Sequence, residues 1–431
     1  MRSSSLSFRM LLGRLLTRSG DQAWDFAIPL VLLQIFPGEF RLASIYFLLV
    51  RVAMVLFLPR ISQIIDQVDR QKAAQFGIFL QLIGVIAGLA SVIVISKLSH
   101  NSFQSITFVT VFVIMILSGI ASQLGSTFMD ISIANDLVPS SFKGDQLVSF
   151  NSRLRQVDLF TEVVSPVIAG ALLLLNSKSL PLLGFSIIAL WNIISFLPEY
   201  EILKSIFKDR PDLKSKLLKI DESSKQSILT RLRRGWSAFF KEPIAPAILA
   251  YALLWFSVLS PHGVLLTAFL MDGWKLPEVI IGVFRGLGAV FGLLATVLFP
   301  IALKNMSVKK ASLAFLSFQA TVLIVGFCLF LRGDQYGQFG FLTLILFSRI
   351  GLYGFSLGEM QIRQTSIDPS ARGEVNGFAN ALTSLATIGL FSAGVAMPST
   401  DDFKYLVLSS VAFVVLALTV YWSWYRKTKL H

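Results

Sequence analysis

The sequence predicts an all-α integral membrane protein that crosses the bilayer with twelve helices in two six-helix halves. Of its 431 residues, 54% are hydrophobic and 15% are charged, whereas a soluble chain carries about 25% charged residues. Apolar stretches of membrane-spanning length follow one another along the whole chain. This composition excludes an ordinary soluble enzyme.

The chain is strongly basic, with 38 Lys and Arg against 25 Asp and Glu and a formal net charge of +13. In a soluble protein such a charge would indicate a nucleic-acid partner. Here the cations gather in loops, as the positive-inside rule predicts. We therefore expect membrane lipid, and no nucleic acid, around the chain. The single cysteine, Cys328, excludes both a disulfide framework and a thiolate metal cluster.

Twelve apolar segments are expected to span the membrane. They lie at 10–36, 41–65, 73–97, 103–134, 147–175, 180–203, 243–271, 279–303, 308–331, 339–362, 375–398 and 403–425. A long charged stretch rich in Lys and Arg, 204–241, follows the sixth segment and is expected in the cytoplasm. It divides the chain into an N-terminal half, 1–203, and a C-terminal half, 242–431.

An even number of spans places both termini on the cytoplasmic side, in agreement with the basic residues near each end. We expect a monomer in the cell membrane, which for a bacterial chain is the inner membrane. Two six-helix halves joined by a basic loop resemble the layout of the major facilitator superfamily, in which the halves rock about a midplane site. Twelve spans use roughly 300 residues, so we expect no catalytic domain and no enzyme.

The first span contains the sequence TRSGDQAWDF, in which Thr17, Asp21 and Asp25 are spaced i, i+4, i+8 and share one helix face. A carboxylate inside a membrane is costly and therefore indicates a function or a partner. Two carboxylates beside a hydroxyl suit a divalent cation or a proton relay. The alternative is an internal ion pair with Arg18 or with Arg51 of the second span.

The sixth span contains WNIISFLPEY, which places Asn192, Ser195 and Glu199 on one face. Pro198 is expected to break or kink this helix and free backbone carbonyls, as in the discontinuous helices of transporters. The alternative is a polar cluster that only joins helices through hydrogen bonds. Gln81, in the third span, is either a further oxygen ligand for an ion or a residue that only joins helices through hydrogen bonds.

His262 is the one histidine inside a predicted span, and it lies between Pro261 and Gly263 in SVLSPHGVLL. These neighbours are expected to unwind the seventh helix. An imidazole at a broken helix can bind a metal or a proton. The alternative is a hydrogen-bonded packing residue.

Polar residues also gather at the predicted cytoplasmic ends of the spans. The stretch DQVDRQK, with Asp66 and Arg70, is a degenerate form of the loop signature by which the superfamily locks its halves in one state. Charges at these places are equally what the positive-inside rule predicts.

Several motifs in order along most of the chain resemble the ferroportin family of iron exporters. They are GDQAWDFAIPLVLLQIF, DQVDRQKAAQ, NSRLRQVDLFTEVVSPVIAG, WNIISFLPEY, SRIGLYGFSL and ARGEVNGFANAL. The resemblance implies export of ferrous iron or a similar divalent metal, such as cobalt, by alternating access. It also implies proton coupling and calcium as a cofactor, without an organic cofactor.

The resemblance assigns two overlapping ion sites to the N-terminal half. The transition metal is assigned to Thr17, Asp21, Asn192, Ser195 and Phe196, and calcium to Asp21, Gln81, Asn192 and Glu199. The gating positions are assigned to Asp66, Arg70, Asp136, Asn151, Arg155 and Arg349. Oxygen ligands of this kind are those that calcium prefers.

The C-terminal half departs from the vertebrate pattern of a cysteine on helix seven and a histidine on helix eleven. Gly263 occupies the cysteine position, His262 stands beside it, and the predicted eleventh span contains no histidine. A second metal site would therefore depend on His262.

Two other functions remain open from the sequence. One is a proton-coupled antiporter of organic cations or drugs, in which Asp21 and Asp25 bind protons and a cationic substrate. The other is a membrane scaffold without transport, which the costly intramembrane acids disfavour. Flux assays with metals and with organic cations separate the three.

Overall fold

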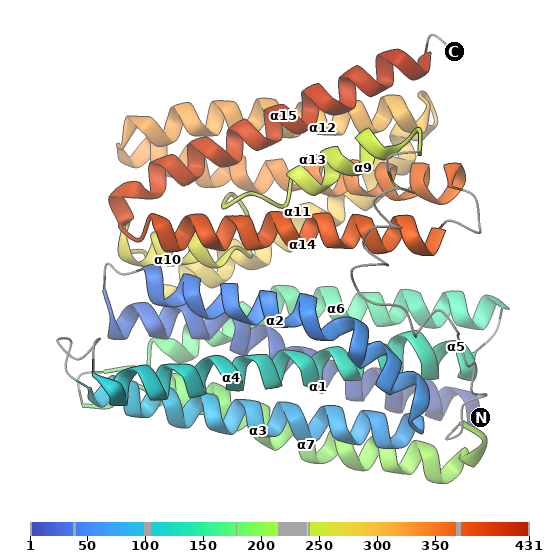
Figure 1. Ribbon diagram of the computed structural model, residues 1–431, viewed down its shortest axis with the longest axis vertical. Helices are drawn as coiled ribbons and strands as arrows, with labels where there is room; N and C mark the ends of the chain where they lie inside the picture. Colours follow the sequence, from blue (N-terminus) through green and yellow to red (C-terminus); the bar gives the residue numbers. More distant parts are fainter. Residues whose placement is uncertain are drawn as a thin grey trace. The chain divides into compact units, whose positions relative to one another are not determined.

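The computed structural model describes residues 2–37, 40–98, 105–142, 144–177, 179–213, 239, 242–367 and 372–429. Within these ranges the chain folds into helices and contains no strand (Figure 1). The all-α prediction is confirmed, and helices occur at all twelve predicted spans.

The six spans of the N-terminal half form long helices. They are α1 (Arg2–Ile35), α2 (Phe40–Gln67), α3 (Arg70–Lys97), α4 (Ile106–Met129), α6 (Gly144–Leu173) and α7 (Leu183–Asp209). α4 continues into a π-helical segment, η2 (Asp130–Leu137), and the short helix α5 (Val138–Ser141). After α7 comes a 3₁₀ turn, η3 (Pro211–Leu213). α7 thus extends into the stretch 204–241 predicted as a linker, most of which lies outside the described residues.

The sequence predicted a break or a kink at Pro198, and the structure shows no break there. α7 is continuous through Pro198. A proline removes one backbone hydrogen bond, and a membrane helix tolerates the loss where neighbouring helices and hydroxyl side chains satisfy the freed carbonyl.

The C-terminal half begins with a broken span, as Pro261 and Gly263 predicted. Its two pieces are α9 (Ala245–Leu253) and α10 (Val264–Asp272). The remaining helices are α11 (Glu278–Leu303), α12 (Val308–Arg332), α13 (Gln335–Ser366), α14 (Arg372–Ala396), the 3₁₀ turn η5 (Thr400–Asp402) and α15 (Phe403–Lys429).

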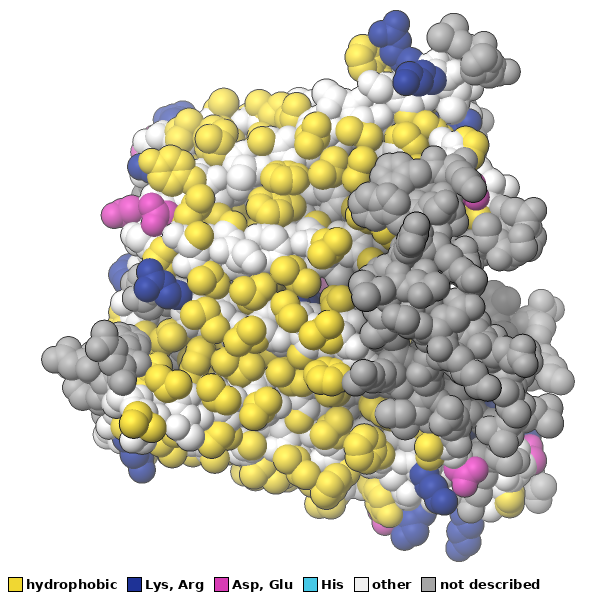
Figure 2. Space-filling view, viewed as in Figure 1, with side chains coloured by type: hydrophobic (Ala, Val, Ile, Leu, Met, Phe, Trp, Pro, Cys, Tyr) yellow, Lys and Arg dark blue, Asp and Glu magenta, His cyan; other side chains and the backbone are white. Residues whose placement is uncertain are grey.

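Nine helices in the described part of the chain are long and apolar enough to cross a membrane: α3, α4, α6, α7 and α11 to α15. α9 and α10 have nine residues each, too few to cross alone. Figure 2 shows hydrophobic side chains spread along the helices, with charged side chains toward their ends. Large apolar side chains such as Leu117 and Leu197 are exposed, as expected where lipid is the solvent.

The chain divides into two compact units. The first comprises Met1–Pro37, Ile45–Ser224 and Trp274–Val283, and the second Gly38–Ser44, Lys225–Gly273 and Phe284–His431.

In the first unit, glycines bring the backbones of α3 and α4 into contact. A Cβ atom on Gly84 would lie 2.6 Å from the Ser122 amide nitrogen, and one on Gly125 would lie 2.6 Å from the Gly77 carbonyl oxygen. Membrane helices associate through such small residues because lipid gives no hydrophobic driving force between them. The close approach sets Gln81 of α3 beside Gly125 of α4.

The second unit repeats this packing with α12 and α13. A Cβ atom on Gly351 of α13 would lie 2.7 Å from the Phe315 carbonyl oxygen of α12, and Gly354 packs against the Phe315 ring. Each unit therefore contains at least one pair of helices in backbone contact.

α1 packs against both α6 and α7 in the first unit. Its C-terminal part is apolar and inaccessible to solvent, with Phe26, Ala27 and Leu30 at 0% exposure. Polar residues occupy the preceding turns of the same helix. Because these turns are enclosed by neighbouring helices, α1 carries its polar side chains into the interior of the unit.

Candidate functional site

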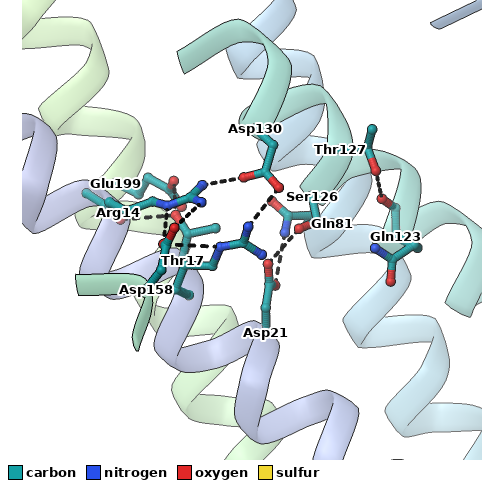
Figure 3. A network of polar contacts seen from close by, with 12 residues as sticks. Arg14, Thr17, Asp21, Gln81, Gln123, Ser126, Thr127, Asp130, Asp158 and Glu199 are labelled. Carbon is teal, nitrogen blue, oxygen red and sulfur yellow. Dashed lines mark hydrogen bonds and ion pairs between the residues drawn. The ribbon is translucent and has the colours of Figure 1, made fainter. Parts of the chain in front are cut away.

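Asp21 of α1 joins three helices of the first unit (Figure 3). Its Oδ1 atom accepts a hydrogen bond from Nε2 of Gln81 on α3 at 3.1 Å, and its Oδ2 atom accepts one from Oγ of Ser126 on α4 at 2.7 Å. The glycine contact between α3 and α4 brings these two donors to one carboxylate. The sequence predicted the roles of Asp21 and Gln81 but did not single out Ser126, a small polar residue in an otherwise apolar span.

Thr17 lies one helical turn before Asp21 and contacts α7. Its hydroxyl donates a hydrogen bond to the Glu199 carboxylate of α7. Thr17 is 5% exposed and Glu199 1% exposed. The structure therefore brings together the polar faces predicted for the first and sixth spans.

Asn192, Ser195 and Phe196 of α7 are also buried in this unit. The Asn192 amide packs against α1, since a Cβ atom on Gly20 would lie 2.6 Å from its Oδ1 atom. The Ser195 hydroxyl donates to the Asn192 carbonyl oxygen at 2.7 Å. The Asn192 amide therefore lies beside the backbone that carries Asp21.

Three oxygen atoms of this cluster are buried acceptors without a hydrogen-bond donor among the described residues. They are Gln81 Oε1, Asn192 Oδ1 and Glu199 Oε2. A buried polar atom without a partner is unfavourable by about 1–3 kcal/mol. The donor set fits a hard cation, because carboxylate and amide oxygens are the ligands of calcium and similar ions.

Asp25 differs from the other predicted acids of α1. Its side chain is exposed, whereas that of Asp21 is partly buried. The oxygen cluster described above therefore contains Asp21 and not Asp25.

A second polar cluster lies one to two turns before Asp21 on α1 (Figure 3). Arg14 forms ion pairs with Asp130, at the start of η2, and with Asp158 of α6, where its Nε lies 2.7 Å from Oδ1. Arg18 pairs with the same two carboxylates, at 2.9 Å to Asp130 and 3.6 Å to Asp158. The sequence proposed Arg18 as a partner of the α1 acids, whereas its ion pairs in the structure are with Asp130 and Asp158; Arg14 and Asp130 were not singled out.

A small cavity connects the two clusters. It has a volume of about 20 Å³, and its polar lining consists of Arg9, Arg14, Thr17 and Glu199. This is room for about one water molecule. The cavity places a polar space between the oxygen cluster and the ion pairs.

His262 of the second unit lies in the segment between α9 and α10. The guanidinium groups of Arg285 on α11 and Arg349 on α13 act electrostatically on its ring. A second metal site at His262 stays a prediction, and the two positive charges oppose a dication there.

The predicted gating residues are only partly described. The side chains of Asp66, Asp136, Asn151 and Arg155 lie outside the described residues. Arg70 donates hydrogen bonds to the Leu213 carbonyl oxygen and to the Ser140 hydroxyl, both at 3.0 Å, at one end of the first unit. Arg349 is buried midway along α13, over the ring of Tyr353 at 5.2 Å.

No group of three or more His, Cys, Asp and Glu residues that could hold a metal forms within the described ranges. The oxygen cluster of the first unit contains two carboxylates together with neutral amide and hydroxyl oxygens. Such a set is typical of hard cations rather than of zinc or copper sites.

Membrane helices in two six-helix sets, with a buried polar cluster inside a set, define a transporter of the major facilitator superfamily and not an enzyme. A crystal structure of a D-xylose–proton symporter shares the fold, with a TM-score of 0.70, 14% identity and 97% coverage of both chains. The Ferroportin1 (FPN1) family model matches residues 4–414. The chain belongs to the ferroportin family.

Three comparisons show how similar the chain is to members of this family. The ferreportin of Bdellovibrio bacteriovorus is 45% identical over 417 residues, covering 96% of this chain and 94% of that protein. A bacterial homologue of the iron transporter ferroportin, solved in an inward-facing state, is 43% identical with a TM-score of 0.88 and 98% coverage of both chains. An outward-facing structure of such a homologue with soaked iron is 43% identical, with a TM-score of 0.67, and the match covers 97% of this chain and 98% of that chain.

Proposed function

We propose that this chain exports divalent transition-metal ions, ferrous iron and ions of similar chemistry such as cobalt, by alternating access, coupled to protons and dependent on calcium. The observation that supports this most directly is the set of three buried acceptor oxygens on Gln81, Asn192 and Glu199, which have no donor among the described residues. They lie around α1 at Asp21 and Thr17, and a bound cation would satisfy them.

The charges of the first unit also favour a dication. Arg14 and Arg18 balance Asp130 and Asp158 in the ion-pair cluster. The carboxylates of Asp21 and Glu199 remain, and together they carry two negative charges when ionised. One divalent ion neutralises them, whereas a monovalent organic cation leaves a buried negative charge.

Calcium would be held by Asp21, Gln81, Asn192 and Glu199, and when bound it supplies a fixed positive charge at the centre of the unit. Thr17, Asp21, Asn192, Ser195 and Phe196 line the position proposed for the transported metal. Because Asp21 and Asn192 belong to both sets, occupancy by calcium is expected to change the affinity for the transported metal.

Proton coupling follows from the same two carboxylates. When a dication leaves, two buried negative charges in a low-dielectric interior become unfavourable. Proton binding at Asp21 or Glu199 relieves this cost, so metal release and protonation favour each other. The cavity of about 20 Å³ beside Glu199 has room for the water that brings a proton.

Alternating access is supported by the inward-facing and outward-facing structures of homologous iron transporters. We propose that the chain lies in the cell membrane as a monomer, with both termini in the cytoplasm. Asp66, Arg70, Asp136, Asn151, Arg155 and Arg349 are proposed to form the contacts that differ between the two states.

The test is flux through the purified chain in sealed liposomes that contain a metal-sensitive dye. Iron, cobalt, manganese, nickel and zinc are each tested with calcium, with a calcium chelator, and with an imposed pH gradient. Calcium-dependent metal flux that responds to the gradient is the expected result. Flux of an organic cation such as ethidium without metal flux would identify a drug antiporter. Flux of neither would favour a membrane scaffold without transport.

A further inference from the structure

Glu359 is a buried carboxylate of the second unit that belongs to none of the proposed metal and calcium sites. It lies on α13, inside a helix long and apolar enough to cross the membrane, and 2% of its side-chain surface is exposed. An acidic residue inside a membrane helix is costly, and in transporters it commonly marks a proton pathway. The groups around Glu359 therefore decide whether it is held as a permanent anion or can take up a proton.

Arg363 is the cation beside this carboxylate. Its Nε atom, one helical turn further along α13, lies 3.3 Å from Oε1 of Glu359. The two groups form an ion pair without a hydrogen bond, since this Oε1 atom is buried and accepts none from the described residues. Arg363 is the more accessible partner, with 20% of its side-chain surface exposed. The pair therefore lacks the hydrogen bonds that make a buried ion pair strong.

The hydroxyl group that α12 places near this position does not compensate for the missing hydrogen bond. Ser312 packs against Gly358, the residue before Glu359, because a Cβ atom on Gly358 would overlap its Oγ atom. The Ser312 hydroxyl donates to the Val308 carbonyl oxygen at 2.8 Å. A hydroxyl has one hydrogen to donate, so Ser312 does not donate to Glu359.

The tyrosine that α15 places near Glu359 is committed in the same way. The Tyr421 ring lies 5.1 Å from the ring of Phe355, one turn before Glu359 on α13, and the two rings meet edge to face. The Tyr421 hydroxyl donates to the Lys309 carbonyl oxygen of α12 at 3.2 Å. The hydrogen bond of this buried phenol therefore joins α15 to α12 and leaves the carboxylate aside.

The cations on these two helices lie over aromatic rings. Nζ of Lys309 on α12 is 5.1 Å from the ring centroid of Trp424, and the Arg426 guanidinium on α15 is 4.9 Å from that of Trp422. Tyr425, one turn after Tyr421, is a neutral side chain at ordinary pH. None of these groups forms a described ion pair with Glu359.

The other two neighbouring helices bring no charge to this position. α9 contains no acidic or basic residue, and its Tyr251 hydroxyl accepts a hydrogen bond from Ser356 at 3.3 Å. α11 contributes the ring of Phe299 beside α13. The described surroundings of Glu359 are thus mostly apolar, and an apolar environment favours the neutral form of a carboxyl group.

We propose that Glu359 binds and releases a proton in the second unit. On binding, a proton from water forms a bond with a carboxylate oxygen of Glu359, and Arg363 keeps its charge at the more accessible end of the pair. Release returns the proton to water and restores the ion pair. Glu359 would then contribute to the proton coupling of transport, and this contribution rests on the proposed function, whereas proton binding itself does not.

The test is infrared spectroscopy of the purified full-length chain in nanodiscs, without metal, titrated from acid to alkaline buffer. A protonated carboxyl group has a C=O band that a carboxylate lacks, so the wild-type chain should lose one such band as Glu359 ionises. Glu359→Gln should lack this band, and Glu359→Asp should restore a titrating one. Glu201→Gln is the control, because Glu201 is exposed on α7. Identical titrations of Glu359→Gln and the wild type would overturn the proposal.

A second variant keeps the test independent of the folding of Glu359→Gln. Arg363→Gln removes the cation that favours the charged carboxylate, so the Glu359 band should persist into more alkaline buffer. Arg332→Gln is its control, since Arg332 is exposed and pairs with Asp334 at 2.7 Å. A band that moves equally in both arginine variants, or in neither, would show that the titrating group is not beside Arg363 and would overturn the proposal.

Proton movement during transport tests the contribution to coupling. In sealed liposomes with a pH-sensitive dye, a metal gradient should move fewer protons per metal ion through Glu359→Gln than through the wild type. An unchanged ratio would overturn the coupling role. If the wild type moves no metal, the proposed function fails, and the infrared titration still decides whether Glu359 binds a proton.

Discussion

The substitution Asp21→Asn tests the centre of the proposed cation site with little change in shape. In the wild-type chain, Asp21 accepts hydrogen bonds from Gln81 at 3.1 Å and from Ser126 at 2.7 Å. Asparagine keeps one acceptor for Gln81, and the Ser126 hydroxyl can rotate to accept from the new amide. We therefore expect stability to change by no more than about 1 kcal/mol, and membrane insertion to be unimpaired because a charge is removed.

The effect on metal binding should be much larger. Replacing a residue that only supports a metal ligand weakens binding about 10–100-fold, so loss of a charged ligand should weaken it at least about 100-fold. This corresponds to about 2.7 kcal/mol, at 1.36 kcal/mol per tenfold change. The remaining carboxylate of Glu199 then faces a dication with half of the compensating charge.

The assay is initial metal flux in sealed liposomes at a metal concentration below saturation, with the amount of inserted protein and its unfolding temperature measured alongside. Asp401→Asn is the matched control, because Asp401 is exposed in η5. An Asp21→Asn chain that transports metal at the wild-type rate, with the unfolding temperature unchanged, would show that the oxygen cluster is not the transport site.

Three further substitutions test the surroundings of the site. Glu199→Gln should abolish the response of metal flux to calcium chelation, whereas Glu201→Gln, exposed on the same helix, should keep it; a calcium response in both variants would remove calcium from the cluster. Arg14→Met should lower the free energy of unfolding by about 3 kcal/mol, because it leaves Asp130 and Asp158 with less compensating charge, and adding Asp158→Asn should recover part of the loss in thermal unfolding. Gly84→Leu should destabilise the chain by at least about 3 kcal/mol, since it forces α3 and α4 apart, and an unchanged unfolding temperature would contradict the backbone contact.

Hydropathy predicted the positions of the helices because a membrane span must be apolar over a fixed length. The ends of α11 at Glu278 and Leu303 lie within a residue of the predicted 279–303. The break between α9 and α10 was also predictable, since Pro261 and Gly263 both weaken a helix. At Pro198 the helix does not break, because the environment of a proline decides whether a helix breaks, and sequence spacing does not reveal that environment.

The sequence could predict which site residues share one face of a single helix. The spacing of Thr17 and Asp21 on α1, and of Asn192, Ser195 and Glu199 on α7, indicated two polar faces, and the structure brings them together through Thr17 and Glu199. The partners across helices were not predictable. Arg14 and Asp158 are separated by 144 positions, and no spacing rule relates residues on different helices.

The glycine contacts within the two halves bear on how such a protein can be recognised as a duplication. In the first unit the contacting glycines are on both α3 and α4, and in the second unit they are on α13. α3 with α4, and α12 with α13, are the third and fourth spans of their respective halves, which the fold relates as parallel repeats. The paired backbones are close in both units although different helices provide the glycines, so a search for internal repeats by residue identity would miss a correspondence that a comparison of interhelical spacing shows.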